Sequence, residues 1–142
     1  LVNRDKEIED VRVVGPLRKY TQVEVSRNDA RHLGVKPPVR TSGDIIGSEI
    51  ITLKTDKGEI TREACVIADR HVHMSPSDAI KYGVVNKQKV QIKVLGDKSG
   101  VMDAFIKVGE TGYYEFHIDT DDANAFDLKN GDEVTLVIWV SL

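Results

Sequence analysis

One short unit occurs three times in this chain, and it restricts the fold more than any other feature of the sequence. Each copy alternates polar and apolar residues, then has Ser or Asp, an acid three positions later and an alanine directly after it. Alternation with a period of two is typical of a β-strand. Ser or Asp followed by an acid at the third position is typical of a helix N-terminus. The sequence therefore predicts three strand–helix units, whose strands cover residues 21–26, 70–75 and 114–119.

The segments between these units add further strands and turns. The three helices are expected to end near Gly34, Gly83 and the stretch 128–131, because glycine favours the left-handed conformation that ends helices. The expected β-rich runs are 49–53, 90–94 and 134–140, and the expected hairpin turns are 56–58 and 96–100. This pattern predicts a mainly β fold of two small β-barrels capped by short α-helices. The halves are expected to be 1–68 and 69–142.

The composition argues against two classes of function, nucleic-acid binding and membrane spanning. The formal net charge is −3 with no long basic run, which argues against binding to nucleic acid. The sequence has no apolar stretch of about 20 residues, so it is not expected to span a membrane. The single cysteine, Cys65, excludes an internal disulfide and suits a reducing cytoplasm, where we expect this protein to be located. A lone thiol between Ala64 and Val66 is interpreted as a buried hydrophobe.

The register of the repeat selects candidate metal ligands. Two positions before the three helix caps stand Glu24, His73 and His117. His71 lies two residues before His73, so both imidazoles share one face of a strand. Imidazole and carboxylate ligands suit zinc first, and iron, manganese, nickel or cobalt otherwise. We predict that these four residues hold a divalent metal ion; structural histidines are the alternative, and His32 is interpreted as a surface residue.

Two polar segments are candidates for binding phosphate. Arg18 stands six residues before Glu24, so an unbroken strand would place both side chains on one face. A guanidinium group matches phosphate oxygens through its fixed fork of donors. The loop 40–44, with Arg40 and Ser42, offers further donors. From spacing alone, a surface arginine and a polar turn are the simpler interpretation of these segments.

Four motifs together resemble a known family, the PduL-type phosphotransacylases, also called phosphate propanoyltransferases. They occur in order between about Val11 and Val137, and lie at residues 15–26, 37–44, 70–76 and 117–125. The resemblance implies transfer of an acyl group between coenzyme A and inorganic phosphate, giving acyl phosphate and free coenzyme A. It also implies two zinc ions between two β-barrels.

The resemblance also implies roles for single residues. One zinc ion is assigned to the same four ligands that the repeat register selects, and the complete enzyme would hold two. Arg18 is implied to be a catalytic residue that holds phosphate, which reverses its simpler interpretation. Arg40 and Ser42 are implied to belong to the substrate-binding surroundings. The substrates would be acyl-CoA and phosphate, and the setting would be propanediol degradation in the cytoplasm or inside a bacterial microcompartment.

The sequence departs from the family pattern in one respect. Family members begin with another HxH segment, which supplies the second ion and the first strand of each barrel, and this sequence shows none. We therefore expect each half to lack its N-terminal strand, and the open edges to be covered by a separate segment or a second copy. The chain is expected to be an enzyme, a phosphate acyltransferase, that can be inactive without this segment. The alternatives are a non-catalytic barrel module and a cupin-like metal enzyme, although Glu24 precedes His71 by 47 residues, which argues against a cupin.

Overall fold

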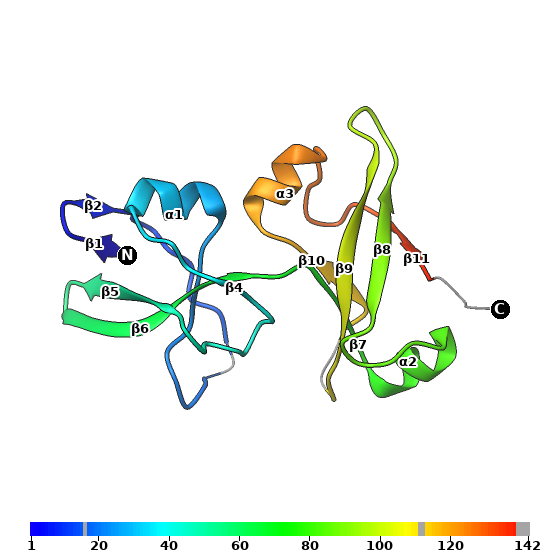
Figure 1. Ribbon diagram of the computed structural model, residues 1–142, viewed down its shortest axis with the longest axis horizontal. Helices are drawn as coiled ribbons and strands as arrows, with labels where there is room; N and C mark the ends of the chain where they lie inside the picture. The colour runs from blue at the N-terminus through cyan, green and yellow to red at the C-terminus, as the bar shows by residue number, and fades with distance from the viewer. Residues whose placement is uncertain (16, 111–112, 139–142) are drawn as a thin grey trace. The chain divides into compact units, whose positions relative to one another are not determined.

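A computed structural model of the chain describes residues 1–15, 17–110 and 113–138 (Figure 1). The chain divides into two compact units, Leu1–Ala68 and Asp69–Leu142. Each unit consists mainly of β-strands with short helices, which confirms the predicted fold class. Within each unit the described strands form a curled sheet that follows an open path. No described helix reaches the length and apolar character that crossing a membrane requires.

In the first unit, β6 is the strand on which the other strands assemble. It pairs antiparallel with β5 and parallel with both β3 and β4. The path of the sheet is β2-β1-β5-β6-β3, with β4 also on β6. The elements are β1 (Val2–Asn3), β2 (Lys6–Glu7), β3 (Val23–Glu24), α1 (Arg27–Leu33), β4 (Val39–Arg40), β5 (Glu49–Thr55) and β6 (Gly58–Ala68). The buried core combines residues of β3, α1, β5 and β6, among them Val23, Leu33, Ile51 and Cys65.

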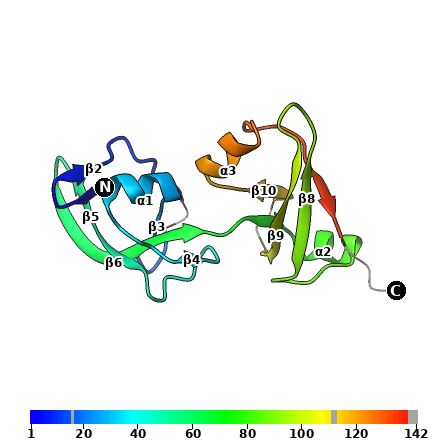
Figure 2. The same cartoon turned by 45° about the horizontal axis from the view of Figure 1, so that its top comes forward.

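The second unit is a five-stranded sheet in the order β10-β7-β9-β8-β11. Its elements are β7 (His71–Met74), α2 (Pro76–Tyr82), β8 (Lys89–Val94), β9 (Gly100–Val108), β10 (Glu115–His117), α3 (Thr120–Ala125) and β11 (Thr135–Val137). In Figures 1 and 2, α2 and α3 lie at opposite ends of the β8–β9 hairpin. The expected strand 134–140 is shorter in the structure, and residues 139–142 lie outside the described part of the chain.

The repeated unit folds as predicted in its first two copies. The Ser26 hydroxyl accepts a hydrogen bond from the Asp29 backbone N–H at 3.1 Å, and the Ser26 N–H donates to the Asp29 carboxylate at 3.3 Å. Ser75 and Asp78 make the same reciprocal pair, at 3.1 and 3.4 Å. These capping boxes satisfy backbone donors that the first turn of a helix leaves without partners.

The third copy differs. Asp119 accepts from the backbone N–H of Asp122 at 2.9 Å, as an N-cap should. The Asp122 carboxylate, however, accepts two hydrogen bonds from Arg70, from Nε and Nη2, both at 2.7 Å. The acid that closes the capping box in the other two copies is therefore used here to attach α3 to the start of β7.

The capping interaction can be tested at Ser75. We expect Ser75→Ala to lower the free energy of unfolding of the protein by about 1 kcal/mol, because the N-cap acceptor is lost. Ser75→Asn should retain most of the stability, since Asn is also a strong N-cap. Urea unfolding checks both variants, with Ser99→Ala in the exposed β8–β9 turn as the control. Equal stability of Ser75→Ala and the unsubstituted protein would contradict the capping role.

Candidate functional site

The antiparallel pairing of β7 with β10 brings three histidines together. His117 lies directly opposite His71, and Glu115 lies opposite His73. The ring centroids are 5.0 Å apart for His71 and His117, 5.6 Å for His73 and His117, and 6.0 Å for His71 and His73. Val72, at the intervening position of β7, is buried in the core. Alternation along the strand therefore places the imidazoles on the face opposite the core.

The positions of the three rings fit a shared metal ion. Three imidazoles on one tetrahedral ion, with metal–nitrogen distances of about 2.0–2.1 Å, have ring centres roughly 5 Å apart. The Nδ1 atom of His71 lies 3.0 Å from the backbone oxygen of Asp69. In the tautomer that donates this hydrogen bond, Nε2 is the atom left for a metal, which is the usual arrangement of ligating histidines.

The described side chains do not form such a site in this structure. Within the described residues, no group of three or more His, Cys, Asp or Glu side chains is arranged to hold a metal. The Nε2 atom of His117 lies 3.3 Å from a carboxylate oxygen of Glu115. The torsion that turns an imidazole has broad minima, so rings at this spacing can turn toward a shared ion at little cost in free energy. The metal assignment stays a prediction.

Burial favours the neutral form of two of these histidines. His71 is buried, and desolvation is the main cause that lowers its pKa, with a smaller contribution from the charge of His117. Desolvation also lowers the pKa of His73, followed by the nearby charge of Lys107. A neutral imidazole is the form that binds metals. Two of the three rings, those of His73 and His117, line a small pocket of about 90 Å³ together with Tyr113 and Glu115.

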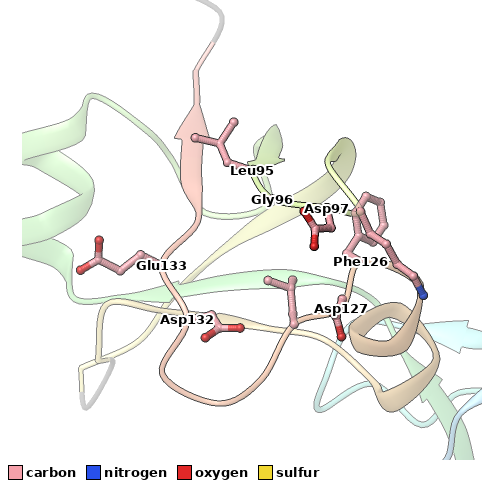
Figure 3. Close-up of a pocket in the computed structure, with 9 residues that line it drawn as sticks. Leu95, Gly96, Asp97, Phe126, Asp127, Asp132 and Glu133 are labelled. Carbon is pink, nitrogen blue, oxygen red and sulfur yellow. The ribbon is translucent and has the colours of Figure 1, made fainter.

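A larger pocket of about 300 Å³ lies elsewhere in the second unit (Figure 3). It is formed by the β8–β9 turn and the segment after α3, and is lined by Leu95, Gly96, Asp97, Lys98, Phe126, Asp127, Leu128, Asp132 and Glu133. Four carboxylates and one lysine give this lining a net negative charge. Such a lining repels phosphate groups, so we place the candidate site at the histidines and not in the larger pocket.

In the first unit, a chain of side-chain contacts holds Arg18 beside β3. Its Nη1 donates to Gln22 Oε1 at 2.9 Å and to the Tyr20 hydroxyl at 3.4 Å. Gln22 Nε2 donates in turn to a carboxylate oxygen of Glu24. The Tyr20 hydroxyl donates to the backbone oxygen of Gly43 at 2.9 Å. The two polar segments that the sequence singled out separately therefore lie together in this unit.

Arg40 holds the backbone of its own loop. Its Nε donates to the Ile46 backbone oxygen at 2.8 Å, and its Nη1 donates to the Val39 backbone oxygen at 2.9 Å. These contacts give Arg40 a structural function in the segment that follows β4. A role of Arg40 and Ser42 in binding substrate stays a prediction.

The structure places the predicted site residues in both units. Arg18 and Glu24 belong to the first unit and the three histidines to the second, so the meeting of Glu24 with the histidines stays a prediction. Sequence reasoning missed two features, Tyr20 and the Arg70–Asp122 pair. Tyr20 stands two residues after Arg18, but β3 begins only at Val23, so strand alternation does not extend to it. The partners of the ion pair are 52 residues apart, and no local pattern signals their contact.

The structure gives no support to a cysteine nucleophile at Cys65. Its side chain is completely buried in the core of the first unit. Burial, with a smaller contribution from the charge of Glu49, raises the pKa of the thiol from 9.0 to about 11. The reactive species is the thiolate, which is therefore scarce at neutral pH. This confirms the interpretation of Cys65 as a buried hydrophobe.

The raised pKa of Cys65 predicts how the free energy of unfolding changes at alkaline pH. The folded-state pKa of about 11 exceeds the ordinary value of 9.0, so the stability due to the protonated thiol is fully present below pH 9. It is lost as the pH rises from 9 towards 11. We expect Cys65→Ala to weaken the fall of unfolding free energy with pH over this range, as measured by urea unfolding. Rapid reaction of the native protein with a thiol reagent at pH 8 would contradict the burial of Cys65.

Comparison with known proteins identifies close relatives. The family model described as phosphate propanoyltransferase matches residues 1–129. A phosphate propanoyltransferase of Thermotoga maritima is 50% identical over 133 residues, which cover 92% of this chain and 63% of the relative. Its counterpart in Shewanella putrefaciens is 42% identical, covering 97% of this chain and 67% of the relative, and that of Rhodobacter capsulatus is 47% identical, covering 87% and 59%. The chain thus spans about three fifths to two thirds of the length of these relatives.

Proposed function

Because the chain belongs to the phosphate propanoyltransferase family, we propose that it serves the transfer of a short acyl group between coenzyme A and inorganic phosphate. In this reaction a phosphate oxygen attacks the carbonyl carbon of the thioester and forms a new C–O bond. The C–S bond then breaks, and the departing thiolate of coenzyme A takes up a proton. The observation that carries the proposal is the meeting of three imidazoles on one face of the β7–β10 pair, in a chain of this family.

Arg18 is the residue that we assign to phosphate. A guanidinium group has five N–H donors, and the contacts to Gln22 and Tyr20 are both made by Nη1. These contacts position the group, and its other donors can bind phosphate oxygens in a bidentate manner. The positive charge lowers the repulsion between phosphate and the developing oxyanion. Holding phosphate in line with the carbonyl supplies a further part of the acceleration.

His71, His73 and His117 would hold a divalent ion, most naturally zinc, with Glu24 of the first unit as a fourth ligand. Three features support this assignment: the spacing of the rings, the hydrogen bond that holds Nδ1 of His71, and the neutral form that burial favours. When bound, zinc would polarise an oxygen of a reactant and stabilise the departing sulfur.

We propose direct transfer, without an acyl-enzyme. The buried thiol of Cys65, with its raised pKa, is poorly suited to act as a nucleophile. Trapping a covalent acyl group on the protein would contradict this mechanism. The location inside a bacterial microcompartment remains a prediction from the resemblance.

Metal content tests the histidine assignment. We expect His73→Ala to remove about one bound metal ion per chain, because a tetrahedral site loses one of its protein ligands. Elemental analysis of the purified protein measures the metal-to-protein ratio. The control is His32→Ala, since His32 is exposed on α1 and lies outside the cluster. An unchanged metal content in His73→Ala would refute the assignment.

Phosphate dependence tests the role of Arg18. We expect Arg18→Gln to raise the KM for phosphate by roughly 10- to 100-fold, the effect of losing hydrogen bonds to a charged group. Release of free thiol from propanoyl-CoA, measured against phosphate concentration, gives this value. Arg12→Gln, at another exposed arginine of the first unit, is the control and should behave like the unsubstituted protein.

The same assay separates the enzyme from the alternatives. A non-catalytic barrel module would cleave no thioester at any phosphate concentration. A metal-dependent hydrolase would release thiol without phosphate. Only phosphate-dependent release, with formation of acyl phosphate, agrees with the proposed reaction.

A further inference from the structure

Arg70, which directly precedes β7, and Asp122 of α3 form an ion pair beside the histidine cluster. The pair is bidentate, with both N–O distances at 2.7 Å. It is partly shielded from water, since the side chains of Arg70 and Asp122 are 38% and 19% exposed. A bidentate, charge-assisted pair fixes orientation as well as distance.

The pair closes the short ladder that aligns the histidines. β7 and β10 share only three residue pairs, and the His71–His117 pair stands at one end of this ladder. Arg70 directly precedes His71, and Asp122 lies in α3, which follows His117 after two residues. The bond between them therefore joins the two chain segments immediately beyond the last pair of histidines.

The arginine is itself held in place by the centre of the sheet. The backbone oxygen of Arg70 accepts a hydrogen bond from the Phe105 N–H of β9 at 2.9 Å. β9 is the strand that β7 and β8 both flank. The guanidinium thus connects α3, and through it the edge strand β10, to the middle of the sheet.

A three-pair ladder at a sheet edge is poorly specified by its own hydrogen bonds, and a slip of one residue would turn His117 to the other face. On these grounds we propose that Arg70 and Asp122 are positioning residues, whose ion pair keeps β10 in register on β7 so that His117 meets His71 and His73. The expected effect of the ion pair on metal binding rests on the proposed function. The effect of the ion pair on the register of β10 does not depend on a bound metal.

The test uses Asp122→Asn, which removes the carboxylate charge and changes the shape of the side chain little. We expect its affinity for Co²⁺, followed by the visible absorption of the bound ion, to fall about tenfold, as is typical when a residue that supports the ligands is lost. Arg70→Lys, which keeps the charge but lacks the fork, should show a smaller fall. Asp103→Asn is the matched control, because it breaks the exposed Lys89–Asp103 pair of the same sheet, also 2.7 Å long.

Hydrogen exchange of the backbone amides of β10 provides a second readout that needs no metal. We expect exchange at Phe116 and His117 to become faster in Asp122→Asn, and to be unchanged in Asp103→Asn. A purely structural role would lower the free energy of unfolding and leave the Co²⁺ affinity and spectrum of the folded protein unaltered.

The outcomes separate this inference from the proposed function. If the unsubstituted protein binds no Co²⁺, the proposed metal site is wrong, and the exchange of β10 alone decides whether the pair positions this strand. If Asp122→Asn binds Co²⁺ as tightly as the unsubstituted protein, or its β10 amides exchange at the same rate, the positioning role is overturned.

Discussion

The second unit depends on the burial of one face of β7. Val72 and Met74 point into the core, where they are 3% and 0% exposed, and alternation then directs His71 and His73 to the opposite face. Burying a side chain of this size contributes about 1.5–3 kcal/mol. A shift of one residue would turn two imidazoles into the apolar core and two apolar side chains out of it. The core therefore determines the register of β7, and the orientation of its histidines follows from that register.

The edge strand β10 lacks an equally strong determinant. Phe116 is only partly buried, and it is the single apolar residue among the three that pair with β7. In the third copy of the repeat, the acidic residue makes a tertiary contact instead of completing a capping box. Asp29 and Asp78 complete capping boxes within their own helices, whereas Asp122 binds Arg70. The loss of one capping interaction at α3 is thus offset by a tertiary contact beside the histidines.

The repeat explains why much of this fold could be predicted. Each of its three strands and three N-caps is encoded by residues within about ten positions, so local physical chemistry was sufficient to locate β3, β7 and β10 and the caps Ser26, Ser75 and Asp119. The two hairpin turns were predictable for the same reason. The path of each sheet was not, because the parallel pairing of β3 and β4 with β6 joins segments far apart in the sequence.

In the candidate site too, local features could be predicted from the sequence and long-range contacts could not. Strand alternation was enough to place His71 beside His73, since both belong to β7. An unbroken strand was the premise for aligning Arg18 with Glu24, but β3 covers only Val23–Glu24. Hydrogen bonds through Gln22 join these two side chains instead. Features that join distant segments escaped prediction, as the contact between Tyr20 and Gly43 and the Arg70–Asp122 pair illustrate.

These long-range contacts have a common physical role. Among the residues expected to meet substrate, Arg18, Glu24 and His117 are exposed, so few apolar contacts restrict their side chains. Polar contacts from other segments restrict these groups instead. Tyr20, which contacts Arg18, is bound to the loop around Gly43, and His71 is bound to the Asp69 backbone. The strand of His117 is held by the bond between α3 and Arg70. Preorganised charge and donor groups are worth most when they need not reorganise during a reaction. In this chain the core orients the strands, and a small set of polar contacts between segments orients the groups that the strands present.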